Sequence, residues 1–272
     1  MWPFSKKTTI AASGILQGAV DHHSHILPGV DDGVETIAES LRILATYETL
    51  GIKELWLTPH IMEDIPNSPA KLQARFAELK AAYTGDIQLH LAAEYMIDNH
   101  LRKLLQEIKN CPSCVRGASN AVAEGDKTTE PQGEISLNSG VPPLLPIGTT
   151  GKHILVETSY YNAPIRFNDT LQQIKSLGYF PLLAHPERYM YLDNADYTKL
   201  HSQGVKFQFN LASLAGGYGK AVKKKAEWLL SNGLYSVAGT DLHCEDAIEY
   251  ITNCKLSEKE VEQVERLLTN KL

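Results

Sequence analysis

Apolar and polar positions along the chain form short strand-like runs separated by longer stretches with helical spacing. Several of the short runs are rich in β-branched or aromatic residues and lie beside Gly, Pro or Asn, as β-strands commonly do. The predicted strands cover Ala19–Ile26, Glu54–His60, Ile87–Tyr95, His153–Tyr160, Phe180–His185, Lys206–Leu211 and Leu234–His243.

Between these runs, apolar residues recur on one face of a helix. In Thr36–Gly51 they are Ile37, Leu41 and Leu44, and Pro69–Gly85 repeats the same spacing. The other predicted helices are Arg166–Gly178, Asn194–Gly204, Tyr218–Gly233 and Ser257–Leu272. Strands that alternate with helices across short connections predict an α/β fold with parallel strands. The periodicity leaves two alternatives open, a closed barrel and an open, doubly wound sheet.

One segment departs from the alternation. Residues 110–143 are rich in Gly, Ser, Asn and Pro and have no apolar period. We interpret this segment as a flexible insertion, because structureless loops of this length are unusual inside compact domains. The prediction is therefore one domain over residues 19–272, interrupted at 110–143 and preceded by an N-terminal extension, residues 1–18.

Composition narrows the class of protein. The chain has 272 residues, of which 43% are apolar, and its net charge of −6 argues against a nucleic-acid partner. The first 18 residues lack the apolar run of a signal peptide, and no stretch approaches the length of a membrane span. We therefore expect a cytoplasmic protein with no membrane span. Composition leaves the ten histidines unexplained.

Many ionisable residues fall where the predicted strands end. In a parallel α/β fold these ends meet at one face, where ligands bind. Alternate residues of a strand point to the same side, so a His-x-His or Asp-x-His pair can reach one cation. Imidazole and carboxylate groups without thiolates suit Zn, Mn or Fe. Taken alone, a strand-end histidine such as His60 is more often a hydrogen-bonded loop residue, but together the set predicts a multinuclear metal site. Its members at the strand ends are His23, His25, His60, Glu94, Glu157, His185, Asp241 and His243, and Asp31 and Asp32 follow in the loop after the first strand.

Together with Asp32, the eight strand-end residues resemble the nine-ligand signature of the PHP (polymerase and histidinol phosphatase) superfamily. The segment Asp21–Gly33 (DHHSHILPGVDDG) and the segment His185–Arg188 (HPER) are similar to the bacterial PHP tyrosine phosphatases of the CpsB/YwqE type. Those enzymes belong to capsule and exopolysaccharide operons. Asn210–Leu214 and Gly216–Gly219 also resemble that group, and the similarity covers about residues 19–109 and 144–250.

The resemblance implies a distorted (β/α)7 barrel of the PHP type and three divalent metal ions, with Mn expected and Fe or Zn as alternatives. By analogy, His23, His25 and Asp241 hold one ion, and Glu94 bridges it to a second. Glu157 and His185 complete the second site, and Asp32, His60 and His243 hold the third ion. Asp31 could exchange roles with Asp32, and we expect His22 to be structural.

Charge arithmetic favours a phosphate substrate. Four carboxylate ligands offset only part of the charge of three divalent cations, which leaves about +2 for a phosphate dianion. We expect phosphomonoester hydrolysis by a metal-activated hydroxide, with Glu94 and Asp241 as catalytic ligands. Arg188 would hold phosphate oxygens through its planar fork, and the alternative is a surface salt bridge with Glu187 or a neighbour.

A cysteine-based mechanism does not fit the chain. None of the four cysteines is followed six positions later by the arginine that a thiol phosphatase needs. Cys111 and Cys114 lie in the insertion and lack a second ligand pair for a zinc site. A second phosphate-binding basic residue is also missing from the segment Cys244–Thr252.

Three functions remain as hypotheses. The first is a metal-dependent protein-tyrosine phosphatase that acts on the C-terminal tail of a bacterial tyrosine kinase of capsular or exopolysaccharide synthesis. The second is a phosphatase of a small, histidinol-phosphate-like metabolite, and the third is a non-catalytic metal-binding regulator of a kinase. The complete ligand set disfavours the third, and the long Asp-Asp-Gly motif favours the first.

Overall fold

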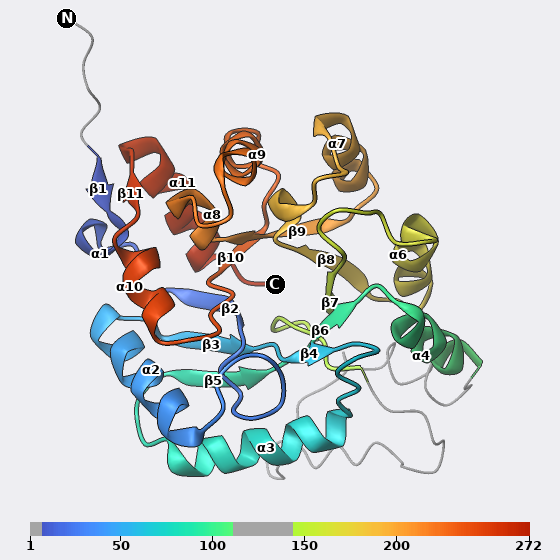
Figure 1. Ribbon diagram of the computed structural model, residues 1–272, viewed down its shortest axis with the longest axis horizontal. Coiled ribbons are helices and arrows are strands. Elements are labelled where there is room, and N and C mark those ends of the chain that lie inside the picture. The colour runs from blue at the N-terminus through green and yellow to red at the C-terminus, as the bar shows by residue number, and fades with distance from the viewer. Residues whose placement is uncertain (1–6, 111–143) are drawn as a thin grey trace, which may run out of the picture.

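The strands curl into a ring that the helices surround (Figure 1). The computed structural model describes residues 7–110 and 144–272. Two of the predicted strands are each interrupted, so that β3 and β4 form one strand position of the ring and β5 and β6 form another. The ring contains β2 (Val20–Ser24), β3 (Glu54–Leu57), β4 (His60–Ile61), β5 (Gln88–Leu91), β6 (Glu94–Met96), β7 (His153–Glu157), β8 (Phe180–Ala184), β9 (Lys206–Asn210) and β10 (Val237–Gly239).

Backbone pairing decides between the barrel and the open sheet. β3 pairs in parallel with β2 and β5, and the parallel order β4-β6-β7-β8-β9-β10 continues around the ring. After β10 the chain returns to β2, where Asp241 N donates to His23 O at 2.8 Å and His25 N donates to Leu242 O at 2.9 Å. Within the described residues, seven strand positions thus close into a distorted barrel, which confirms the predicted fold.

Helices form the outer layer, and several begin at a side-chain cap that the sequence supplies. Thr36 and Glu39 form a capping box at α2, and Ser257 and Glu260 form another at α11. Two helices, α4 and α10, lie outside the predicted helical segments. The larger helices are α2 (Ile37–Leu50), α3 (Pro69–Ala82), α4 (Asn99–Asn110), α6 (Phe167–Ser176), α7 (Asn194–Ser202), α9 (Lys220–Ser231), α10 (Asp246–Thr252) and α11 (Glu258–Thr269).

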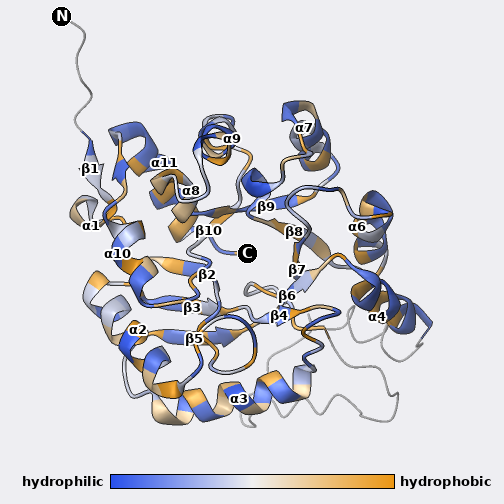
Figure 2. Ribbon diagram, in the orientation of Figure 1, coloured by the Kyte–Doolittle hydropathy of each residue, from blue (hydrophilic) through white to orange (hydrophobic). Residues whose placement is uncertain are grey.

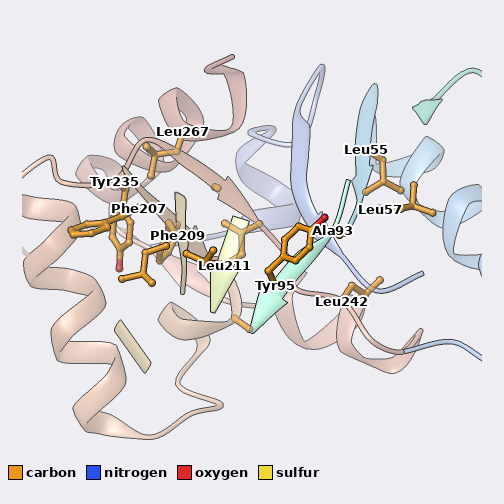
Figure 3. Close-up of a cluster of buried hydrophobic side chains, with 14 of the residues drawn as sticks. Leu55, Leu57, Ala93, Tyr95, Phe207, Phe209, Leu211, Tyr235, Leu242 and Leu267 are labelled. Carbon is orange, nitrogen blue, oxygen red and sulfur yellow. The ribbon is translucent and has the colours of Figure 1, made fainter. Parts of the chain in front are cut away.

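Alternation along the strands creates two apolar layers. One layer lies between the strands and the helices, which carry both polar and apolar residues (Figure 2). Phe207 and Phe209 of β9 lie in this layer beside Tyr235, and the rings of Phe209 and Tyr235 are 5.0 Å apart (Figure 3). A smaller cluster includes Trp56 and Leu272, and the C-terminus lies in the middle of the ring in Figure 1. The members of this second layer are Val20, Trp56, Ala92, Ile147, Leu155, Leu182, Ala184, Val237 and Leu272.

The segments outside the barrel differ in how the structure describes them. Within the predicted N-terminal extension, Thr8–Thr9 (β1) pairs with Lys255–Leu256 (β11), and Ile10 is buried in the outer core. Of the predicted insertion, Asn110 ends α4, and residues 111–143, which include Cys111 and Cys114, lie outside the described residues. None of the helices within the described ranges is long and apolar enough to cross a membrane.

Candidate metal centre and phosphate pocket

All nine predicted ligands lie together at the carboxyl ends of the barrel strands. Their nitrogen and oxygen atoms form four overlapping groups in which every atom lies within 4.8 Å of the others. Asp32 and His243 are at the solvent side, whereas the other seven are buried. The groups are His25-Asp32-His60-His243, His23-Glu94-His185, His23-His25-Asp241 and His60-Glu94-Glu157.

Glu94 occupies the middle of this cluster. Its Oε2 lies 3.3 Å from His23 Nε2, 3.4 Å from His25 Nε2 and 3.2 Å from His60 Nδ1. Oε2 is buried and accepts no hydrogen bond from the described residues. Because a buried carboxylate oxygen is costly without a partner, this atom fits a cation held by the surrounding histidines.

Hydrogen bonds on the far side of the rings set which nitrogen faces the centre. His23 Nδ1 donates to Gln208 Oε1 at 2.9 Å, and His25 Nδ1 donates to Asp31 Oδ2 at 2.9 Å. Both acceptors offer only lone pairs, so the proton of each neutral ring is on Nδ1 and the Nε2 lone pairs point inward. These two Nε2 atoms are 3.0 Å apart. Two lone pairs at that distance repel unless a proton or a cation lies between them.

The electrostatics of the cluster also favour positive charge beside His23 and Glu94. Burial alone lowers the pKa of His23, but the Glu94 and Asp241 carboxylates outweigh it and raise that pKa to about 9. Burial would raise the pKa of Glu94, yet His23 and His185 hold it well below its usual range. His23 therefore favours its protonated form beside an ionised Glu94, and this preference for positive charge next to a buried carboxylate is what a cation site made of histidines and carboxylates requires.

Two of the ligands sit in unusual backbone conformations. Among the described residues other than glycine, only Arg166, His185 and Asp241 have positive φ, with values of 31° at His185 and 54° at Asp241. Such conformations cost free energy and persist where the surroundings enforce them, commonly at functional sites. Here they turn the two side chains inward, at the residue that follows β8 and at the second residue after β10.

The four groups of nitrogen and oxygen atoms resemble the expected assignment of residues to three metal ions but differ from it in one respect. His23, His25 and Asp241 form one group, and Asp32, His60 and His243 lie together with His25. His185 and Glu157 are 3.9 Å apart and fall into separate groups, each of which contains Glu94. Glu94 thus touches both groups, as a bridging ligand would.

Asp31 and Asp32 have different surroundings. The Asp31 carboxylate is buried and accepts hydrogen bonds from His25 Nδ1, His60 N and Gly33 N. Asp32 is 64% exposed, and its Oδ1 lies 3.4 Å from His60 Nε2 and 3.5 Å from His243 Nε2. Asp31 therefore orients a ligand, and Asp32 is placed to be one. His22 is also buried, and its Nδ1 donates to Ala238 O at 3.2 Å.

A pocket of about 430 Å³ opens onto the cluster, and Arg188 reaches into it. Arg188 Nη1 donates to Asp241 Oδ2 at 2.9 Å, and its side chain is 16% exposed. Glu187, the partner considered in the salt-bridge alternative, is instead fully buried and bonded to Ser213 and Tyr235. Among the lining residues of this pocket in the described chain, Arg188 is the only arginine or lysine.

Several residues of the site were missed by the sequence analysis. Gln208 Oε1 accepts both from His23 Nδ1 and from His185 N, and Asn210 Nδ2 donates to Asp241 Oδ2 at 2.9 Å. Both are polar residues at alternate positions of the otherwise apolar run Phe207–Leu211, which was the available signal. Tyr160 and Tyr218 also line the pocket.

A known protein family matches most of the chain. The family described as "Capsular polysaccharide synthesis, CpsB/CapC" matches residues 19–120 and 145–264. The chain belongs to the CpsB/CapC family. The two matched ranges include all nine residues of the candidate metal centre and Arg188.

Individual members of the CpsB/CapC family resemble the chain over most of its length. The tyrosine-protein phosphatase YwqE of Bacillus subtilis is 26% identical over 228 residues, which cover 82% of this chain and 77% of YwqE. The tyrosine-protein phosphatase CpsB of Streptococcus pneumoniae is 26% identical over 238 residues, or 82% of each chain. A solved structure from the pair YwqE and CpsB, described as unique metal-dependent tyrosine phosphatases, has a TM-score of 0.66 at 21% identity. It covers 93% of this chain and 95% of its own, and it shows the same fold.

Proposed function

We propose that this CpsB/CapC member is a metal-dependent phosphatase that removes phosphate from tyrosine residues of proteins. The observation that carries the proposal is the convergence of nine metal-ligating groups and one arginine on a single pocket. The activity named for its relatives YwqE and CpsB supports the same reaction. Three divalent ions, with Mn as the expected metal, would account for the overlapping ligand groups.

The residues of the site would have different roles, which follow from their positions in it. When bound, the divalent cations would activate a water molecule and stabilise charge on the phosphoryl oxygens. His23, His25 and Asp241 would hold one ion, and Asp32, His60 and His243 another. Glu94, which belongs to both of the remaining groups, would hold a third ion together with Glu157 and His185, whose side chains are 3.9 Å apart.

Arg188 would bind the phosphate at the side of the pocket next to Asp241. Its guanidinium presents planar pairs of N–H donors that match two phosphate oxygens. Asp241 Oδ2 holds one edge of the guanidinium, while Asp241 Oδ1 faces His23 and His25. Asp241 thereby links the phosphate-binding arginine to the metal ligands. A phenolate with a pKa near ~10 leaves more readily than an alkoxide, so a dedicated general acid is unnecessary.

The rim of the pocket favours a protein substrate over a small metabolite. Ser159 and Tyr160 line the pocket, and the next residues of the same loop are highly exposed, with Tyr161 at 77% and Ile165 at 79%. Met190, whose N donates to Tyr160 O, is also exposed. Exposed apolar side chains that gather beside a pocket mark an interaction surface. We infer that they contact the peptide around the phosphotyrosine, such as the cytoplasmic C-terminal tail of a tyrosine kinase of capsule synthesis.

One experiment tests the reaction and the substrate class together. The protein is purified with its metals, the metals are quantified, and turnover of a phosphotyrosine peptide is compared with that of histidinol phosphate before and after chelation. We expect at least two metal ions per chain, preference for the peptide, and loss of activity on chelation. Activity that chelation leaves unchanged would refute the metal-dependent mechanism. A preference for histidinol phosphate would refute the proposal of a protein substrate.

A double variant and a control variant test whether the exposed side chains of Tyr161 and Ile165, at the rim of the pocket, contact the peptide. Tyr161→Ser with Ile165→Ser should lower kcat/KM for the phosphotyrosine peptide about tenfold and leave p-nitrophenyl phosphate turnover unchanged. Phe180→Ser is the control, because Phe180 is exposed at the opposite end of β8 from His185. Equal losses on both substrates would contradict a peptide-binding rim.

A further inference from the structure

Two tyrosine rings lie close to the guanidinium group of Arg188. Its Cζ lies 4.1 Å from the centroid of the Tyr160 ring and 4.2 Å from that of the Tyr218 ring. The two tyrosines come from different parts of the barrel, since Tyr160 follows β7 and Tyr218 lies between α8 (Ala212–Ala215) and α9. All three residues line the pocket above the metal centre.

Each ring is itself held in place. Tyr160 stacks against Tyr189 at a centroid distance of 6.3 Å, and its carbonyl oxygen accepts a hydrogen bond from Met190 N at 2.7 Å. The Tyr218 hydroxyl accepts a hydrogen bond from Asn210 Nδ2, the group that also donates to Asp241. The tyrosines are therefore part of the same framework that fixes the metal ligands.

We propose that Tyr160 and Tyr218 are positioning residues that hold the Arg188 guanidinium edge-on to the phosphate. This inference rests on the proposed function, because it assigns the arginine's target as the phosphoryl group of the substrate. Neither tyrosine needs to touch the reacting atoms; each acts through Arg188.

The physical argument comes from the shape of guanidinium. Its N–H donors all lie in one plane, so an aromatic ring that stacks on a face leaves the edges free for a ligand. One edge is anchored by the bond from Nη1 to Asp241 Oδ2. Arginine otherwise loses considerable rotamer freedom when it binds an anion, and a side chain that is already ordered avoids that loss.

The two tyrosine rings also compensate for the lack of a second arginine or lysine side chain in the described part of the pocket. The pocket holds no other arginine or lysine among the described residues, so the orientation of Arg188 decides how well phosphate is held. Because tyrosine rings attract the cation through their π faces, they keep Arg188 in place without competing for its donor edges.

A double-mutant cycle tests the proposal. Tyr160→Leu and Tyr218→Leu are each measured in the wild-type protein and in an Arg188→Met background, with p-nitrophenyl phosphate as substrate. We expect each leucine variant to raise KM and to lower kcat/KM about tenfold, which corresponds to about 1.4 kcal/mol. In the Arg188→Met background the same substitutions should have little further effect.

Three measurements separate positioning from folding. Tyr160→Phe and Tyr218→Phe keep the rings and should restore kcat/KM to within about threefold of wild type. Metal content and the circular dichroism spectrum of the leucine variants should match those of the wild type. Tyr250→Leu is the matched control, because Tyr250 is an exposed tyrosine on α10 and has no ring contact with Arg188 within the described part of the chain.

The affinity of the metal-loaded protein for inorganic phosphate, measured by calorimetry, gives a readout that needs no turnover. It should weaken about tenfold in each leucine variant and be insensitive to those substitutions once Arg188 is methionine. Equal losses with and without Arg188 would show that the rings act on the substrate directly and would overturn the proposal, as would leucine variants with unchanged phosphate affinity. A wild-type protein that binds phosphate with this dependence but hydrolyses no phosphomonoester would refute the proposed function alone.

Discussion

Asp31→Ala is the most informative single perturbation of the metal centre, because Asp31 is not itself among the nine proposed ligands. The buried carboxylate accepts three hydrogen bonds, from His25 Nδ1 at 2.9 Å, His60 N at 3.0 Å and Gly33 N at 3.1 Å. The variant frees His25 to rotate and to change tautomer, and it leaves two backbone N–H groups without their acceptor. Loss of such a supporting group typically lowers metal affinity about 10- to 100-fold.

The stability of the metal-free protein should fall as well. An unpaired buried donor costs about 1–3 kcal/mol, so the two backbone groups together predict a loss of about 2–6 kcal/mol in the free energy of unfolding. Competition with a chelating dye measures the affinity for Mn²⁺, and urea unfolding in the presence of chelator measures the stability. The two assays distinguish a weakened site from a weakened fold.

Asp32→Asn is the matched comparison. Asp32 is more than half exposed and contacts only the His60 and His243 side of the centre, so we expect the loss of one ion at most and little change in stability. Asp31→Ala protein that binds all its metal with wild-type affinity would refute the reasoning, because His25 would then need no partner on Nδ1.

Three further predictions address the pocket and the fold. Arg188→Ala should leave metal content intact and raise KM or lower kcat, and loss of metal would show that its role is in the metal centre. Burial and the nearby Lys206 lower the pKa of His153 to about 4, below the 6.5 of the unfolded chain. The unfolded state therefore binds more protons between these values, and stability falls by about 1–2 kcal/mol from pH 6.5 to 4, after discounting for solvent screening. His153→Leu should remove that part of the dependence in urea titrations, and an unchanged slope would contradict it. Leu272→Ala should cost about 2–3 kcal/mol in thermal or urea unfolding, because Leu272 is buried within the barrel cluster, and a loss below about 0.5 kcal/mol would show that it contributes little packing.

The sequence by itself determined most of the elements and the members of the candidate metal centre. Short apolar runs rich in β-branched and aromatic residues located the seven strand positions, and helical spacing located six of the outer helices, because both patterns follow from backbone geometry. Strand-end placement then identified eight of the nine residues that the folded chain brings together, since parallel strands share one carboxyl face, and the family resemblance added Asp32. The motif from Asp21 to Gly33 pointed to the family that the comparison confirms.

Tertiary structure alone decided closure of the barrel and the roles of neighbouring residues. The hydrogen bonds that join β10 to β2 link residues more than 200 positions apart, and no local pattern encodes them. Asp31 and Asp32 are chemically identical in sequence, yet one is buried against His25 and the other faces solvent. Tyr160 and Tyr218 likewise meet across Arg188 only after folding. The physical reason is the same in each case: sequence spacing fixes which side of an element a residue occupies, whereas its partners depend on which elements pack beside it.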